Sequence, residues 1–372
     1  MTSTVRVRDL FDGDRFIGPA EVTYGNGKIV AICGYEGDEF DADIMAPGLI
    51  DVQVNGGGGS LFNTDLSVEG LAVMAKAHAQ FGTTAMLPTL ITDSLETIQR
   101  AADAMAKAIA EGVAGVVGIH FEGPHLAAAK KGTHAEQFIR PISDAEMAVY
   151  TRQDLGKVMV TLAGETVPPE QIAQLKEAGV IVVLGHTNCT YAQAKGAIEA
   201  GVSGFTHLFN AMSNWTGREL GAVGAALMHQ ETYAGIIADG FHLAPETIQL
   251  VDQLRNPDYN VLVTDSMSLV GTDLTEIAFF DRVITNDNGK LTSTTGELAG
   301  SNLDMIEAVR YCIQDLGIDP VRTLRMATVN PARWISDEQR GVIAVGKEAD
   351  FILASNDWKL IKTVIAGTAV TD

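Results

Sequence analysis

The feature that most constrains the fold of this chain is a set of short polar runs. Each run lies where a hydrophobic segment ends. The clearest are residues 120–124, 185–188, 206–210 and 264–266, and each follows directly after a mostly apolar run. They contain His, Glu, Asp and Asn, residue types that bind metal ions or transfer protons. In a parallel barrel the carboxyl ends of all strands meet on one face, so residues far apart in the sequence can form one site there.

The middle of the chain alternates apolar strand candidates with Ala-rich helical stretches. The strand candidates number eight: residues 48–54, 83–87, 113–121, 157–163, 180–185, 204–207, 234–238 and 261–265. The clearest helical stretches are residues 71–80, 95–111, 169–178, 191–200 and 245–254. Alternation of eight buried strands with helices predicts an α/β protein with a (β/α)8 TIM barrel, and a doubly wound open sheet is the alternative.

Both ends of the chain differ in texture from this middle. Short strand candidates separated by Gly and Asp turns occupy residues 5–10, 21–24 and 28–33, and the tail repeats the pattern at 341–343, 350–354 and 358–366. We therefore expect one small β-sandwich domain built from both termini, residues 1–46 and 340–372. The barrel would occupy residues 47–339.

Composition excludes several classes of partner. The chain has 372 residues, enough for a large core, and a formal net charge of −21. That charge argues against nucleic acid or an anionic membrane as partner, because both need a basic surface. Three widely spaced cysteines predict a reducing compartment without a disulfide framework. We find neither a signal-peptide pattern nor an apolar run of about 18 residues, and we expect a cytoplasmic protein.

Three residues in the polar runs have the chemistry of metal ligands. Glu122 stands at a strand end, where a buried carboxylate is costly without a cation or hydrogen-bonding partners. His186 and His207 are 21 residues apart, one strand–helix–strand step, and neutral imidazole is the commonest metal-ligand side chain. Each residue alone is explained better by a structural hydrogen bond or ion pair. Together they predict a His2Glu metal site with an open position for water, as in a metal-dependent hydrolase.

Other polar residues would face the same mouth. Asp265 follows the last strand candidate and is suited to move a proton beside a metal-bound water, although a turn Asp explains it equally well. His120 shares a strand face with Glu122 because side chains alternate with period two, so it is a candidate supporting residue. Possible substrate contacts, each explained better as structural when taken singly, are His134, Asn210, Ala211, Arg218 and His242.

The order and number of these motifs resemble the N-acetylglucosamine-6-phosphate deacetylases, a family of the amidohydrolase superfamily. The resemblance covers nearly the whole length. Its motifs are residues 46–51, 82–84, 88–92, 120–124, 131–134, 185–188, 206–212, 239–242, 263–265, 298–301, 330–332 and 346–350. Any one motif is weak, whereas the ordered set is highly specific.

The resemblance implies a barrel of the metallo-dependent hydrolase type with a small β-sandwich from both termini. It implies one divalent metal ion held by Glu122, His186 and His207, and Asp265 as the catalytic acid/base. His134 would polarise the acetyl carbonyl, with the sugar phosphate held by His242, Asn210 and Ala211. Arg218 matches the residue that reaches the phosphate across a homodimer interface. The implied reaction converts N-acetyl-D-glucosamine 6-phosphate, an amino-sugar phosphate, to D-glucosamine 6-phosphate and acetate.

Some positions depart from related patterns. Many amidohydrolases carry His-x-His at the end of the first strand, where this chain has Gln53 and Asn55. Amides are poor metal ligands beside imidazole, so we predict one metal ion, Zn²⁺ first, with Fe²⁺, Mn²⁺ and Co²⁺ also compatible. His125 replaces an expected aromatic residue, and Cys189 near His186 is atypical.

Three alternatives stay open. A deacetylase of N-acetylgalactosamine 6-phosphate would need only one or two changed contacts, because the two sugars differ in one hydroxyl. The barrel could also serve another amidohydrolase reaction, on a cyclic amide or an N-acyl amino acid. A metal-free scaffold protein is disfavoured, since a scaffold needs none of the retained polar residues.

Overall fold

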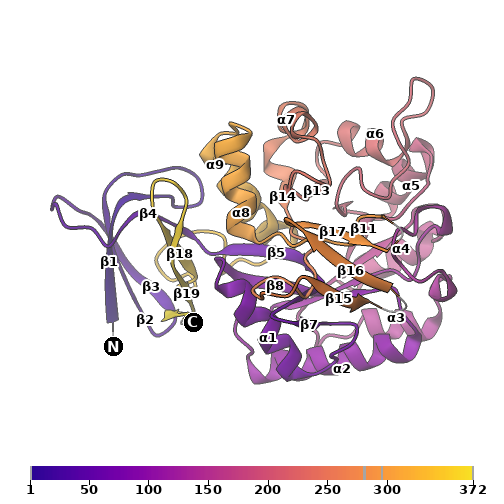
Figure 1. Cartoon of the computed structure of the whole chain (residues 1–372), viewed down its shortest axis with the longest axis horizontal. Coiled ribbons are helices and arrows are strands. Elements are labelled where there is room, and N and C mark those ends of the chain that lie inside the picture. The colour runs from indigo at the N-terminus through magenta and orange to yellow at the C-terminus, as the bar shows by residue number, and fades with distance from the viewer. Residues whose placement is uncertain (1, 280–281, 295, 371–372) are drawn as a thin grey trace.

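The structure, a computed structural model, describes residues 2–279, 282–294 and 296–370. Figure 1 shows a large α/β body and, beside it, a smaller group of strands that contains both the N-terminus and the C-terminus. In the described part of the chain, no helix has the length and apolar character to cross a membrane.

The α/β body is built around eight parallel strands in the order β14-β13-β12-β11-β10-β9-β8-β5. They are β5 (Leu49–Val54), β8 (Thr83–Ile91), β9 (Gly118–Glu122), β10 (Lys157–Leu162), β11 (Ile181–Leu184), β12 (Gly204–Phe205), β13 (Tyr233–Ile236) and β14 (Asn260–Leu262). A parallel bridge between Val54 and Ser266 brings the last strand back to the first. The predicted (β/α)8 barrel is confirmed, and the open-sheet alternative is wrong.

Helices connect and cover the strands. They are α1 (Val68–Ala79), α2 (Leu95–Glu111), α3 (Asp144–Tyr150), α4 (Pro169–Glu177), α5 (Tyr191–Ala200), α6 (Gly221–Met228), α7 (Pro245–Leu254), α8 (Met305–Arg310), α9 (Pro320–Ala327) and α10 (Val329–Trp334). Short helical turns are η1 (Ala128–Lys130), η2 (Glu136–Phe138), η3 (Pro257–Tyr259) and η4 (Tyr311–Asp315). Side-chain caps define several helix starts: Ser94 accepts from Thr97 N at α2, and Thr190 forms a capping box with Gln193 at α5.

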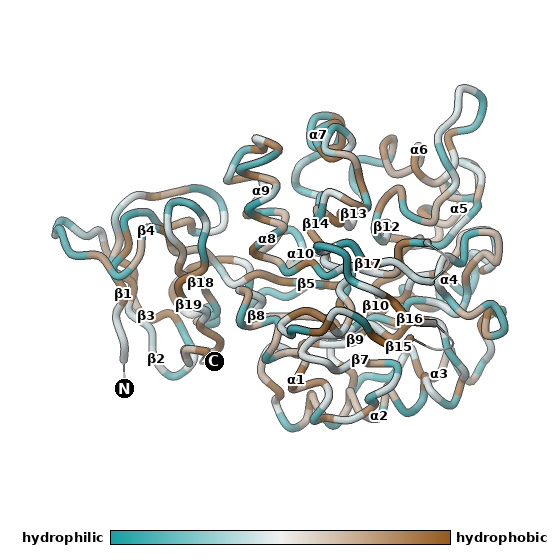
Figure 2. The backbone as a smooth tube through the Cα atoms, viewed as in Figure 1, coloured by the Kyte–Doolittle hydropathy of each residue, from teal (hydrophilic) through white to brown (hydrophobic). Residues whose placement is uncertain are grey.

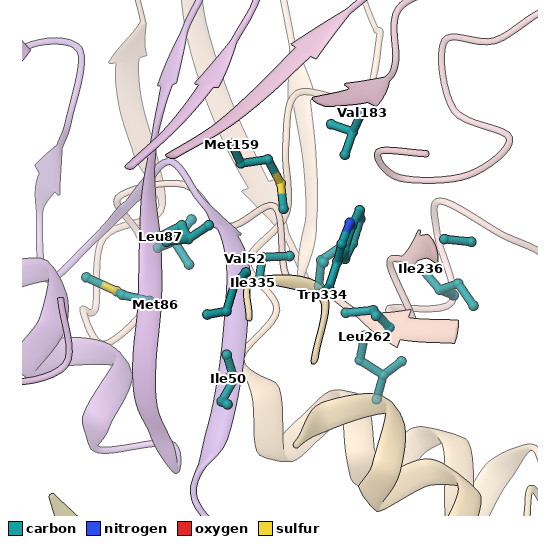
Figure 3. Packing of buried hydrophobic residues seen from close by; sticks show 14 of the residues in the cluster. Ile50, Val52, Met86, Leu87, Met159, Val183, Ile236, Leu262, Trp334 and Ile335 are labelled. Atoms are coloured by element: carbon teal, nitrogen blue, oxygen red, sulfur yellow. The ribbon is translucent and has the colours of Figure 1, made fainter. Parts of the chain in front are cut away.

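The barrel core explains why the strands are apolar almost throughout. Strands covered on both faces bury every side chain, and β5 and β8 are buried at each position. Figure 3 shows residues from several strands packing with the end of α10 and the residue after it: Ile50, Val52, Met86, Leu87, Met159, Val183, Ile236, Leu262, Trp334 and Ile335. In Figure 2 these strands run as hydrophobic segments, and hydrophilic segments lie largely on the outside.

The small strand group combines both ends of the chain in one seven-stranded sheet, ordered β20-β19-β18-β4-β1-β2-β3. Its strands are β1 (Thr2–Leu10), β2 (Ala20–Gly25), β3 (Lys28–Gly34), β4 (Ala42–Pro47), β18 (Phe351–Ala354), β19 (Leu360–Ile365) and β20 (Thr368–Ala369). A separate apolar cluster, including Val7, Leu10 and Phe351, supports it. The expected small β domain from both termini is confirmed, while the boundaries at residues 46/47 and 339/340 stay predictions.

Sequence analysis missed a three-stranded antiparallel sheet of β15 (Glu276–Phe279), β16 (Arg282–Asp287) and β17 (Lys290–Ser293). Asn288 and Gly289, both with positive φ, form the turn between β16 and β17. Asn-Gly between strands is the strongest short hairpin signal, so the sequence did contain the information. A tiny hairpin of β6 (Gly56–Gly57) and β7 (Ser60–Leu61) also follows β5.

Candidate active site

A cavity of 350 Å³ lies at the carboxyl ends of the barrel strands. Nine of the twelve predicted site residues line it: Asn55, Glu122, His134, His186, His207, Asn210, Ala211, His242 and Asp265. Three predicted residues do not line it. Gln53 is buried and donates to Glu122, His120 is buried against Val52 and Thr161, and Arg218 is exposed on the segment between β12 and α6.

The strand ends bring three ligand-type side chains to one point. Glu122 is the last residue of β9, and His186 and His207 lie two residues beyond β11 and β12. His207 Nε2 lies 3.0 Å from Glu122 Oε1 and 3.0 Å from His186 Nε2, and all three residues are buried. All three ligand atoms lie within 4.8 Å of one another, a spacing that fits a single metal ion.

Hydrogen bonds around this cluster fit a cation at its centre. His186 Nδ1 lies 2.9 Å from the carbonyl oxygen of Lys130, which only accepts, so Nδ1 carries the proton. His186 Nε2 then directs a lone pair at the other two ligand atoms, the arrangement in which an outer hydrogen bond orients a metal-ligating imidazole. Burial would raise the pKa of the Glu122 carboxyl, but the adjacent imidazoles of His186 and His207 hold it well below its ordinary value. Glu122 therefore stays ionised, as a ligand must.

Backbone strain concentrates in the same strand-end runs. Five of the ten non-glycine residues with positive φ in the described chain lie in these runs or directly after one: His186 (φ 47°), His207 (φ 30°), Phe209 (φ 77°), Ala211 (φ 49°) and Asp265 (φ 52°). Such conformations cost on the order of 1–3 kcal/mol each and persist only where the surroundings enforce them. Their clustering around the cavity is typical of an active site.

The side-chain amides of Asn55 and Gln53 hold the carboxylate of Asp265 in place. Asn55 Nδ2 donates to Oδ1 at 2.7 Å and Gln53 Nε2 at 3.2 Å, and Gln53 Nε2 lies 3.0 Å from Glu122 Oε1. No described residue donates a hydrogen bond to Oδ2, and Asp265 lines the cavity. Burial, with the neighbouring charge of Glu122, raises the pKa of Asp265 to about 6. A carboxyl group with that pKa is suited to exchange a proton near neutral pH.

Two further predicted histidines have different environments. The ring of His134 packs against that of His186 in a tilted arrangement, with centroids 4.2 Å apart, and its Nδ1 lies 2.8 Å from Thr92 Oγ1, so Nε2 remains for a ligand in the cavity. Burial lowers the pKa of His134 well below its ordinary value, which keeps the ring neutral. Both nitrogens of His120 are occupied, by Val52 O and Thr161 Oγ1, so His120 supports the floor of the site rather than binding a ligand.

His242 also lines the cavity. Asp239 Oδ2 lies 2.6 Å from His242 Nδ1, and Asp239 Oδ1 accepts from the backbone N–H groups of Phe241 and His242. This carboxylate therefore fixes the ring of His242. Asn210 and Ala211 line the same cavity. Arg218 is not one of the cavity residues in a single chain, so its role stays a prediction about a second copy.

The structure also explains two atypical residues and adds some that sequence analysis missed. His125 is bonded through both ring nitrogens, to Arg140 O and the Tyr150 hydroxyl, and Cys189 is buried with its thiol pKa raised to about 11. Neither lines the cavity. Residues missed as lining or supporting groups include Thr92, Lys130, Met267, Phe279 and Leu298. Thr92 and Leu298 belong to motifs already noted, but the contact of Thr92 with His134 joins two segments far apart in the sequence and has no local signal.

A parallel (β/α)8 barrel with a buried His2Glu cluster and a carboxyl group beyond its last strand defines a metal-dependent amidohydrolase. The model of the amidohydrolase family matches residues 44–370, and the chain belongs to that family.

Individual relatives narrow the likeness to one branch of the family. The chain is 48% identical over 323 residues to N-acetylgalactosamine-6-phosphate deacetylase of Shewanella sp. (strain ANA-3), covering 87% of this chain and 82% of the relative. Its structure matches N-acetylglucosamine-6-phosphate deacetylase from Pasteurella multocida with a TM-score of 0.92, 34% identity and 99% coverage of both chains. A Mycobacterium smegmatis deacetylase mutant, in complex with N-acetyl-D-glucosamine-6-phosphate, matches with a TM-score of 0.91, 26% identity and full coverage of both. The resemblance to sugar-phosphate deacetylases is confirmed.

Proposed function

We propose that this chain hydrolyses the acetamide of N-acetyl-D-glucosamine 6-phosphate to D-glucosamine 6-phosphate and acetate. One observation carries the proposal: a single cavity holds the Glu122–His186–His207 cluster, Asp265 and further polar groups of His242, Asn210 and Ala211. Hydrolysis needs the first two at the amide, and a sugar phosphate needs the third. The names of the relatives support the same reaction.

Three side chains would hold the metal ion through Glu122 Oε1, His186 Nε2 and His207 Nε2. When bound, a divalent cation supplies Lewis acidity and lowers the pKa of water. Zn²⁺ suits this donor set, and Fe²⁺, Mn²⁺ or Co²⁺ would also fit. Asp265 takes the proton from the attacking water and passes it to the amine nitrogen as the C–N bond breaks. His134 orients the acetyl carbonyl by facing its oxygen.

The phosphate needs positive or donor groups that an acidic chain must supply locally. His242, fixed by Asp239, and the Asn210–Ala211 segment are suited to bind it. We propose that Arg218 of the partner subunit completes the phosphate-binding site in a homodimer, because Arg218 of the same chain is exposed and does not line its cavity. A cytoplasmic location belongs to the same proposal.

The galacto epimer is the second candidate substrate. The relative from Shewanella sp., at 48% identity, is an N-acetylgalactosamine-6-phosphate deacetylase, whereas the Pasteurella structure at 34% identity is a deacetylase of the gluco epimer. The two sugars differ only at one hydroxyl group, so the same cluster and the same Asp265 would act on both.

The test is acetate release by purified protein from both 6-phosphate epimers and from unphosphorylated N-acetylglucosamine. Each reaction is run before and after chelation and metal add-back. We expect rapid, metal-restored release that depends on the phosphate, and the ratio of kcat/KM values identifies the preferred epimer. Absence of release from all three sugars by metal-loaded protein would reject the proposal.

A further inference from the structure

The seam between the first and last barrel strands carries a buried carboxylate that the proposed reaction does not use. Beyond the end of β14, residues 264–266 lie against residues 51–56 of the first strand. Asp265 N donates to Gln53 O at 2.9 Å, and Asn55 N donates to Ser266 O at 2.9 Å. Asp51 lies just below these bonds and is 0% exposed.

Three donors surround the Asp51 carboxylate, and two of them belong to one residue. Thr264 Oγ1 donates to Oδ2 at 2.5 Å and Thr264 N approaches Oδ1 at 3.3 Å, while Gln53 N donates to Oδ1 at 3.1 Å. No Lys, Arg or His of the described residues forms an ion pair with it. Burial raises the pKa of Asp51 to about 7, which shows how unfavourable this place is for a carboxylate. A residue kept at such a cost needs a reason beyond filling space.

The contacts of Asp51 lead directly to Asp265. Thr264, which Asp51 binds through side chain and backbone, is the residue before Asp265, and Asp265 has the left-handed φ of 52°. Ser301 Oγ also donates to Thr264 O at 2.6 Å, so Thr264 is held on both sides. A fixed Thr264 determines where the chain enters the strained residue. Freed from Asp51, the segment can relax toward ordinary φ values and turn the Asp265 carboxylate away from Asn55.

We propose that Asp51 and Thr264 form a clamp across the barrel seam that positions Asp265 for proton transfer. The role of Asp265 in this inference rests on the proposed function, whereas the geometry of the clamp does not. Asp51 is a positioning residue, because it acts through Thr264 and does not line the cavity.

The best test removes the hydroxyl group alone. Asp51→Ala would leave two buried N–H groups without their acceptor and can fail to fold, whereas Thr264→Val keeps nearly the same shape. Thr264→Ser retains the hydroxyl as the conservative variant. Thr323→Val is the matched control, because Thr323 is also 0% exposed, lies in α9, and its hydroxyl has no hydrogen-bond partner in the described chain.

Crystal structures give a readout that is independent of any reaction. In Thr264→Val we expect Asp265 to lose its positive φ, or its Oδ1 to move out of hydrogen-bond distance of Asn55 Nδ2. Thr264→Ser and Thr323→Val should keep both features. An Asp265 that is unchanged in Thr264→Val overturns the clamp, whether or not the protein is a deacetylase.

Kinetics then separate positioning from stability. For Thr264→Val we expect kcat to fall by about tenfold or more, as for other small misplacements of a catalytic group, with KM within about twofold and the metal content unchanged. Thr264→Ser should restore kcat. A purely structural role would lower the melting temperature but leave kcat per metal-loaded site at the level of Thr323→Val. Inactive wild-type protein would reject the proposed function and leave the crystallographic test standing.

Discussion

The two sides of the cavity floor hold their carboxylates by opposite means. On one side Glu122 faces His186 and His207, and His186 presents an imidazole lone pair to the carboxylate. On the other side Asp265 faces Asn55 and Gln53, whose amide N–H groups donate to it. Converging lone pairs need a cation between them, whereas a carboxylate oxygen that accepts two amide hydrogen bonds does not. The first side therefore suits a metal ion, and the second suits a carboxyl group that exchanges a proton, as proposed.

This difference explains how Gln53 and Asn55, at the end of the first strand, affect the number of metal ions that the site can bind. Imidazoles at these positions would offer lone pairs and extend the metal side toward Asp265. The amides instead supply donors, and Gln53 Nε2 lies within hydrogen-bond distance of both carboxylates. The expectation of a single metal ion follows from this geometry as well as from the weakness of amides as ligands.

The largest effect is expected from breaking the metal side. In Glu122→Gln the amide nitrogen would place a donor beside two imidazoles, so we expect metal content to fall to near zero and acetate release to fall to background. Elemental analysis and acetate release measure the two. Glu199→Gln, an exposed change on α5, is the control. Full metal retention by Glu122→Gln would show that Glu122 is not a ligand.

Asp265→Asn should separate the two sides. The variant keeps its size but loses the basic oxygen, so we expect kcat to fall by roughly 10²–10⁴-fold, the range for a general acid/base. Metal content should match that of the wild type, because Asp265 is not part of the ligand cluster. Asp273→Asn, in an exposed segment, controls for the charge. A near-normal rate in Asp265→Asn would remove the residue from the mechanism.

Asn55→Leu sharpens the comparison with a smaller change. It removes the 2.7 Å donor to Asp265 and leaves Gln53 in place. A hydrogen bond to a charged group contributes about 1.5–3 kcal/mol, so we expect kcat to fall by about tenfold to a hundredfold. Metal content should stay unchanged. Metal loss as severe as in Glu122→Gln would mean that Asn55 supports metal binding, so that the two sides do not act independently.

Sequence alone predicted the barrel well because its strands are buried on both faces and appear as apolar runs. The third strand is the instructive deviation: it was expected from residue 113 but β9 begins at Gly118, because Gly115, with φ of 85°, makes a turn in the apolar run. Hydrophobicity marks burial, and it does not distinguish a strand from the buried turn that precedes it.

The candidate site was predictable where one residue type at a strand end carries the chemistry, as for His186 and Asp265. Contacts between segments far apart in the sequence were not predictable in this way. The bonds of Thr92 to His134 and of Asp51 to Thr264 join positions 42 and 213 residues apart, and no local pattern marks them. The proposed role of Arg218 is a different case, because it requires a second copy of the chain and one chain alone does not test it.

The smallest effect on the rate is expected from lowering the pH to about 6. Because burial and the charge of Glu122 raise the pKa of Asp265 to about 6, the carboxyl becomes protonated below that pH and can no longer accept a proton. A cation in the neighbouring cluster lowers this pKa, so the acid limb of kcat/KM should lie at or below about pH 6, with the rate no more than halved there. Rate profiles from pH 4.5 to 8 measure the limb, and metal content checked at each pH separates proton uptake from loss of the ion. A limb above about pH 7 with the metal retained would assign the titration to a group other than Asp265. That result would leave the Glu122–His186–His207 cluster as the metal site, and another residue would have to be the acid/base.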